Sequence, residues 1–126
     1  MTNTEVMELV AEQVYEACLN CGAEDSEAFN CALDAARNAS EPFRLVYGFH
    51  MDLHEQLSNE AGTSETSGDG HDHAWNTAND AAWDDIFHAA YLAVIGHGFQ
   101  LADDEGLTDK EQIDARVDAY VDSVLD

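Results

Sequence analysis

The segment from Ala81 to Phe99 is the longest apolar stretch in an otherwise strongly acidic chain. Its apolar side chains recur at steps of three and four residues, which places them on one face of a helix: Trp83, Ile86, Phe87, Ala90 and Val94. From Tyr91 onward, Leu92 and Ile95 make the opposite face apolar as well. Such a helix is stable only when neighbouring segments cover it on several sides. The pattern therefore predicts a central helix over residues 81–99.

Local signals set the bounds of this central helix. Asn76, Thr77 or Asn79 is expected to start it, and the glycines of Gly96-His97-Gly98 are expected to break or bend it. The stretch from Gly62 to Asp72 contains glycines, Ser, Thr, His and acids but no apolar residue, which is typical of a loop. We therefore expect an acidic loop over about residues 62–72, directly before the central helix.

Four other segments show helical spacing, each with an apolar face and a face rich in carboxylates. Capping-box matches at Thr2-x-x-Glu5 and Thr108-x-x-Glu111 begin the first and the last of them. Gly22 ends the first, and Pro42 separates the second from the third because the residue before a proline disfavours the helical conformation. The predicted helices span about residues 3–21, 25–40, 42–59 and 108–126.

The apolar positions of these four helices are expected to face inward. They are Val6, Val10, Val14, Ala17 and Cys21; Phe29, Ala32, Leu33 and Ala36; Phe43, Val46, His50, Leu53 and Leu57; and Ile113, Val117, Tyr120, Val121 and Val124. A short strand at residues 43–49 is the competing prediction, because β-type residues cluster there. The chain is predicted to form one all-α domain over residues 1–126, a compact bundle of about five helices around the central one.

The large excess of acidic over basic residues limits the kinds of partner that the protein is expected to bind. The chain has 27 Asp and Glu residues against four Lys and Arg residues, a formal net charge of −23, and such self-repulsion opposes compaction. Direct nucleic-acid binding is disfavoured because proteins gain that affinity by neutralising phosphates with Lys and Arg, so a positively charged partner is favoured. No stretch reaches membrane-spanning length and the N-terminus does not resemble a signal peptide. No membrane partner and a cytoplasmic location are therefore expected.

Carboxylates form rows at three- and four-residue steps on the first and last predicted helices. Four helical residues advance about 6 Å, which is of the same order as the roughly 3.4 Å of axial rise per phosphate on a nucleic-acid strand. Like charges at this spacing destabilise an isolated helix by roughly 0.2–0.5 kcal/mol per pair. Solvated faces of an acidic protein are one interpretation, and a surface that imitates DNA or RNA phosphates is the preferred one. The predicted contact residues are Glu5, Glu8, Glu12, Glu16, Asp80, Asp84, Asp85, Asp103, Asp104, Asp114, Asp118 and Asp122.

The C-terminal half resembles phage-encoded anti-restriction proteins that imitate DNA. The shared features are Asp85-Ile86-Phe87 in the central helix, Gly106-Leu107 after an acidic turn and Ala115-Arg116 on the terminal acidic helix. The long run of acids at the end of that family is missing here. The resemblance is to phage-encoded DNA mimics as a general type, which includes acidic anti-CRISPR proteins. It implies a helical inhibitor that occupies the basic groove of a restriction enzyme or CRISPR effector in the host cytoplasm.

Six histidines include arrangements that resemble metal sites. His50 and His54 lie one helical turn apart, and zinc accepts such ligands. However, His50 belongs to an apolar face, no third ligand for His54 can be identified, and His71-Asp72 lies in the expected loop, where rigid coordination is disfavoured. No metal and no cofactor are therefore predicted. A His/Asp metal-binding helical protein stays an alternative, with the candidate ligands His50, His54, His71 and His73.

Signals for catalysis are weak. The chain contains no nucleophile elbow, phosphate loop or dinucleotide fingerprint, so no enzyme activity and no catalytic residue are predicted. The three cysteines, Cys18, Cys21 and Cys31, lie in helical context and are expected to be small buried hydrophobes.

Two further expectations concern environment and assembly. A protein from a salt-loving organism would also carry many acids, because a Debye length of about 3 Å in molar salt screens their repulsion. A halophilic helical protein of unrelated function is thus the leading alternative to the phosphate mimic. Trp75, Tyr91 or Phe99 is expected to remain uncovered by so small a core, which is compatible with a homodimer.

Overall fold

The chain forms five α-helices in the computed structural model, which describes residues 1–60 and 68–125, with the side chains of residues 57–60 and 68–71 outside the description. The helices are α1 (Asn3–Asn20), α2 (Asp25–Ala39), α3 (Glu41–Glu60), α4 (Gly68–Asp104) and α5 (Lys110–Leu125). The predicted all-α fold class is therefore confirmed, and the competing strand at residues 43–49 is wrong because this segment lies inside α3. Among the described residues, no helix is long and apolar enough to cross a membrane.

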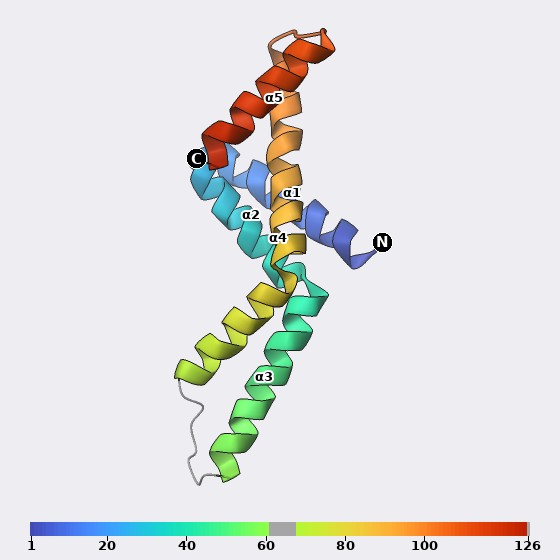
Figure 1. Cartoon of the computed structure of the whole chain (residues 1–126). Helices are drawn as coiled ribbons and strands as arrows, with labels where there is room; N and C mark the ends of the chain where they lie inside the picture. Colours follow the sequence, from blue (N-terminus) through green and yellow to red (C-terminus); the bar gives the residue numbers. More distant parts are fainter. Residues whose placement is uncertain (61–67, 126) are drawn as a thin grey trace.

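The central position of α4 is confirmed, because each of the other four helices packs against it. Figure 1 shows that α3 and the beginning of α4 run side by side and extend away from α1, α2 and α5, which surround the remainder of α4. We call α3 and the first turns of α4, up to Trp75, the helical arm. In this arm Phe43 packs against Trp75 with ring centroids 6.3 Å apart.

The start of α4 differs from the prediction. The helix begins at Gly68 and not at residues 76–79, so residues 68–72 of the expected loop are helical; residues 62–67 of that loop lie outside the described residues. Buried Ala74 belongs to the added helical turns, and buried Ala78 follows it one turn later. Packing against α3 therefore outweighs the poor helix propensity of the glycines and acids at this end.

The predicted break at Gly96-His97-Gly98 is also wrong, since α4 continues to Asp104. A Cβ atom on Gly98 would lie 3.4 Å from side-chain atoms of both Val117 and Tyr120. Glycine therefore serves here for close packing of α4 against α5, and tertiary contacts hold the helix through a locally unfavourable sequence.

Gly96→Ala is expected to raise the free energy of unfolding by roughly 0.5–1 kcal/mol, because alanine is favoured over glycine inside a helix. A Cβ atom at position 96 meets nothing within 4 Å, so the substitution introduces no clash. Urea denaturation measures the change, with Gly98→Ala as a comparison whose gain is expected to be smaller. A loss of stability in the Gly96 variant would contradict an uninterrupted helix at this position.

The buried face of α1 differs from the predicted one. The buried residues of this helix are Met7, Ala11 and Tyr15. Of the residues predicted to face inward, three are half-buried and two are exposed: Val6, Val10, Val14, Ala17 and Cys21. In the sequence, the row that contains the three valines is more apolar than the row that is buried, and it was therefore predicted to face inward. The other row is buried because the small Ala11 permits a close helix crossing and the hydroxyl of Tyr15 finds a buried partner on α5.

The predicted inner residues of α2 are all buried, and those of α5 are buried except Ile113, which is half-buried. Other predictions were less accurate: Trp83 is 37% exposed and Leu53 is 38% exposed, and the side chain of Leu57 lies outside the described residues. The buried face of α4 is mainly alanine, which allows neighbouring helices to approach closely. Its buried hydrophobic residues are Ala74, Ala78, Ala82, Ile86, Ala89, Ala90, Ala93, Val94 and Ala102.

Both ends of α1 follow the sequence signals, whereas the cap of α5 is shifted by one residue. The side chain of Thr2 accepts a hydrogen bond from the backbone N–H of Glu5, as the capping box predicts. Gly22 and Gly106 have positive φ angles of 91° and 77°, and they reverse the chain after α1 and α4. The N-terminus of α5 is capped by Asp109, whose side chain accepts from the Glu111 N–H, and not by the predicted Thr108. These caps fix both ends of α1 and the N-terminal end of α5.

Candidate functional site

The acidic rows on α1 and α5 lie beside the buried faces of their helices. Glu8, Glu12 and Glu16 each follow a buried residue of α1 by one position, which turns them about 100° away from the core. On α5 every member of the row is exposed: Asp114, Asp118 and Asp122. Because α1 crosses α4 while α5 folds back beside its C-terminal part, the two rows run in different directions (Figure 1).

The α1 row is not uniform. Glu5 and Glu12 are exposed, whereas Glu8 and Glu16 are half-buried. The carboxylate of Glu16 lies 2.8 Å from Nδ1 of His97 on α4, so it joins two helices in addition to carrying charge. Glu16 is therefore the member of this row least free to contact a partner.

The other predicted contact residues lie along α4 and are all exposed: Asp80, Asp84, Asp85, Asp103 and Asp104. Near the last two, Nε of Arg116 lies 2.8 Å and 3.1 Å from the two carboxylate oxygens of Glu105. Another cation, Arg37, pairs with Asp34 at 2.6 Å. Within the described residues, no Lys or Arg forms a salt bridge with a predicted contact residue, so these carboxylates, apart from that of Glu16 beside His97, remain available to an external cation.

Arg37 connects α2 to the helical arm. Its Nε donates to Oδ1 of Asn79 at 2.9 Å, and its guanidinium carbon lies 4.7 Å from the centre of the Trp75 ring. The side chain is 11% exposed. This positive charge is therefore used in packing between helices.

A buried polar cluster joins α1, α4 and α5. The hydroxyl groups of Tyr15 and Tyr120 are hydrogen-bonded to each other. The ring of His97 packs against both, with centroids 5.8 Å from Tyr15 and 5.3 Å from Tyr120. Burial, together with the hydrogen bond to Tyr120, raises the pKa of Tyr15, and burial also raises the pKa of Tyr120.

This cluster has the properties of a structural connection. In the described part of the chain, no buried side-chain nitrogen or oxygen lacks a hydrogen-bond partner. The raised pKa keeps both tyrosines protonated near neutral pH, so neither supplies a ready base. Sequence reasoning placed Tyr120 on the inner face of its helix but did not pair it with Tyr15, because the two residues are far apart in the chain.

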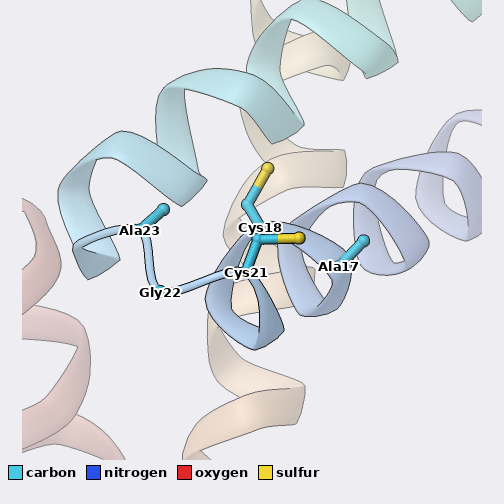
Figure 2. A pocket seen from close by; sticks show the side chains of 5 residues that line it. All are labelled: Ala17, Cys18, Cys21, Gly22 and Ala23. Carbon is cyan, nitrogen blue, oxygen red and sulfur yellow. The ribbon is translucent and has the colours of Figure 1, made fainter.

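Two of the three cysteines line an open pocket of about 410 Å³ at the end of α1, whose lining residues are Ala17, Cys18, Cys21, Gly22 and Ala23 (Figure 2). The expectation that all three cysteines are buried is wrong: Cys18 is half-buried, and Cys21 and Cys31 are exposed. Cys21 caps the end of α1, and Cys31 lies outside the buried face of α2.

Interaction with the thiol of Cys31, together with desolvation, raises the pKa of Cys18. A raised pKa is the opposite of what activates a nucleophilic cysteine. The pocket lining also contains no carboxylate or imidazole. The pocket therefore lacks the partners that a thiol nucleophile needs.

Three of the metal candidates meet in the helical arm. The ring of His73 on α4 contacts the rings of His50 and His54 on α3, with centroids 5.4 Å and 5.5 Å apart. The side chain of His71 lies outside the described residues. Among the described side chains, no three His, Cys, Asp or Glu residues are arranged as they stand to hold a metal ion. Sequence reasoning missed His73 as a partner of His54 because it started the central helix only at residues 76–79, so that His73 lay outside any predicted helix.

The aromatic residues expected to remain uncovered differ in exposure. Phe99 is 47% exposed, whereas Trp75 and Tyr91 are half-buried, with Tyr91 stacked on Phe87. A more exposed apolar row runs along α3 through Leu45, at 66%, and Phe49, at 65%. The homodimer stays a prediction, for which this row on the arm offers apolar surface.

Comparison with protein-family models, curated proteins and solved structures finds no match to this chain.

Proposed function

We propose that this protein is an acidic inhibitor that imitates nucleic-acid phosphates and occupies the basic groove of a nucleic-acid-binding defence protein, such as a restriction enzyme or a CRISPR effector. The observation that carries the proposal is the exposed row on α5, together with Glu5 and Glu12 on α1. Among the described residues, no Lys or Arg forms a salt bridge with these carboxylates. Unpaired surface charge of one sign attracts and steers a partner of the opposite sign.

The helices that carry the rows are held in place by the core. Val117, Tyr120, Val121 and Val124 anchor α5, and Tyr15 links α1 to α5 through Tyr120. A partner therefore meets carboxylates on ordered helices and loses less binding free energy to their ordering than it would with a disordered acidic tail. Exposed Asp80, Asp84 and Asp85 on α4 extend the charge beyond the two rows.

The proposed action is stoichiometric occupation of the partner and not catalysis. A phosphate mimic requires charge placement and a stable scaffold, and the features that could carry catalysis are used otherwise: the tyrosine cluster joins helices, and the thiol of Cys18 has a raised pKa. The expected place of action is the cytoplasm of a host cell that contains the defence protein.

Adaptation to high salt is the competing proposal, because unpaired surface acids also suit a protein that folds in molar salt. The two proposals differ in what happens in dilute buffer. A halophilic protein unfolds there as screening is lost, whereas a mimic has to be folded at physiological salt. Circular dichroism, measured between about 0.05 M and 2 M salt, shows at which salt concentrations the protein is folded and so distinguishes the two proposals.

Displacement of DNA tests the proposed function directly. A fluorescent DNA duplex bound to a restriction enzyme or to a CRISPR effector loaded with guide is titrated with the protein at about 0.15 M salt. We expect stoichiometric loss of DNA binding, with a potency that falls as salt rises. A denatured sample of the same chain is the control for charge alone. A protein that is folded at this salt and displaces DNA no better than the denatured control would contradict the proposal.

A further inference from the structure

The three imidazoles of the helical arm are brought together by two helices. His50 and His54 are four residues apart on α3, a spacing that places two histidines on one face and that metal-binding helices use. His73 comes from the first turns of α4 and contacts both rings edge to face, with interplanar angles of 85° and 79°. The ligand missing from the sequence pattern is therefore supplied by the neighbouring helix.

The spacing of these rings suits coordination of one ion. Zinc–nitrogen bonds of about 2.0–2.1 Å place the ring centres of two histidine ligands on a tetrahedral ion about 5 Å apart. The observed centroid separations of 5.4 Å and 5.5 Å are close to this value. In this arrangement no three of the described His, Cys, Asp or Glu side chains are positioned to hold a metal ion, so the imidazole nitrogens have to reorient before they can bind one. Because the ring torsion of histidine is broad and His73 is exposed, side-chain rotation can turn the nitrogens toward a common point.

We propose that His50, His54 and His73 form an inducible site for a late first-row divalent cation, with Zn²⁺ as the expected ion and water in the fourth position. Neutral imidazole is a good ligand for Zn²⁺ and Ni²⁺, whereas Mg²⁺ and Ca²⁺ prefer carboxylate oxygens. The net charge of −23 also raises the concentration of cations near the surface. The bound ion links α3 to α4 and stabilises the helical arm, independently of the proposed phosphate mimicry.

Calorimetric titration of the full chain with Zn²⁺ tests this site, in a buffer with excess Mg²⁺ to occupy the carboxylates. We expect saturable binding of one ion per chain. His73→Gln is expected to weaken it by at least about tenfold, the smallest loss usual for disturbing a metal site. His88→Gln is the matched control, because His88 is an exposed histidine of α4 without a ring contact to the cluster, and it is expected to bind as the unaltered protein does.

A second measurement does not depend on the variants. Two-dimensional NMR of the imidazole nitrogens is expected to show shifts at His50, His54 and His73 on addition of one equivalent of Zn²⁺, and none at His88. Binding that persists unchanged in the His50→Gln, His54→Gln, His73→Gln triple variant would overturn the proposal. Binding of one ion per two chains, or Zn²⁺ binding no tighter than that of Mg²⁺, would overturn it as well.

Discussion

Reversal of the α5 row by Asp114→Lys, Asp118→Lys and Asp122→Lys is expected to slow association with a basic groove by roughly 10- to 100-fold. The three carboxylates are exposed and lie outside the core, so each substitution replaces attraction by repulsion at the encounter without removing a buried contact. The thermal midpoint is expected to change little. Surface plasmon resonance at several salt concentrations measures the association rate, whose dependence on salt should also become weaker.

The matched control for this variant is Glu27→Lys, Asp52→Lys and Glu55→Lys. It changes the net charge by the same amount, and its residues are exposed on α2 and α3, outside the predicted contact set. We expect a much smaller loss of association rate than for the α5 variant. If association slows equally in both variants, the effect comes from net charge alone. If the association rate of the α5 variant is unchanged, the α5 row is not part of the interface.

Tyr15→Ala is expected to lower the free energy of unfolding by about 3–5 kcal/mol, as for other large aromatic residues removed from a core. Tyr15 is 0% exposed and its hydroxyl is bonded to Tyr120, so the variant leaves both a cavity and a weakened polar cluster. The free energy of unfolding of a domain of this size is about 5–15 kcal/mol in total. A loss of this size therefore brings the variant close to unfolding. Urea denaturation measures the loss. Leu45→Ala, at a position 66% exposed, is the control and should change stability by less than about 0.5 kcal/mol.

Alkaline pH is expected to weaken the same cluster. Tyrosine in an unfolded chain has a pKa of about 10, and burial raises the pKa of Tyr15 and Tyr120 above it in the folded protein. Below pH 10 both states are protonated, and stability is unaffected by these groups. Above pH 10 the unfolded chain loses its protons first, so the free energy of unfolding falls by up to about 1.4 kcal/mol per pH unit for each tyrosine.

Tyr15→Phe isolates this effect, because it keeps most of the side-chain volume and removes one ionisation. Its stability at pH 7 is expected to be lower by about 0.5–1.5 kcal/mol, the usual contribution of one hydrogen bond. Its decline between pH 10 and 11, followed by urea denaturation, should be less steep than that of the unaltered chain. An identical decline would show that Tyr15 does not titrate with unfolding.

The site was less predictable from sequence than the fold. The acids of α5 could be assigned to the surface because the neighbouring valines and Tyr120 defined the inner face of that helix. Glu16 was included with the other acids of α1, although it bonds to His97 from another helix. The cysteines were expected in the core because free cysteine is usually buried, but the faces that α1 and α2 turn inward leave Cys21 and Cys31 outside.

The sequence by itself determined the helical class, the chain reversal at Gly22 and the inner faces of α2 and α5, because capping, glycine conformation and periodicity act over a few neighbouring residues. Only the tertiary structure decided three other features. Tyr15 is buried instead of the valine row of α1, α4 continues through Gly96 and Gly98, and His73 lies against His50 and His54. Each depends on contacts between residues far apart in the chain, which local periodicity cannot encode.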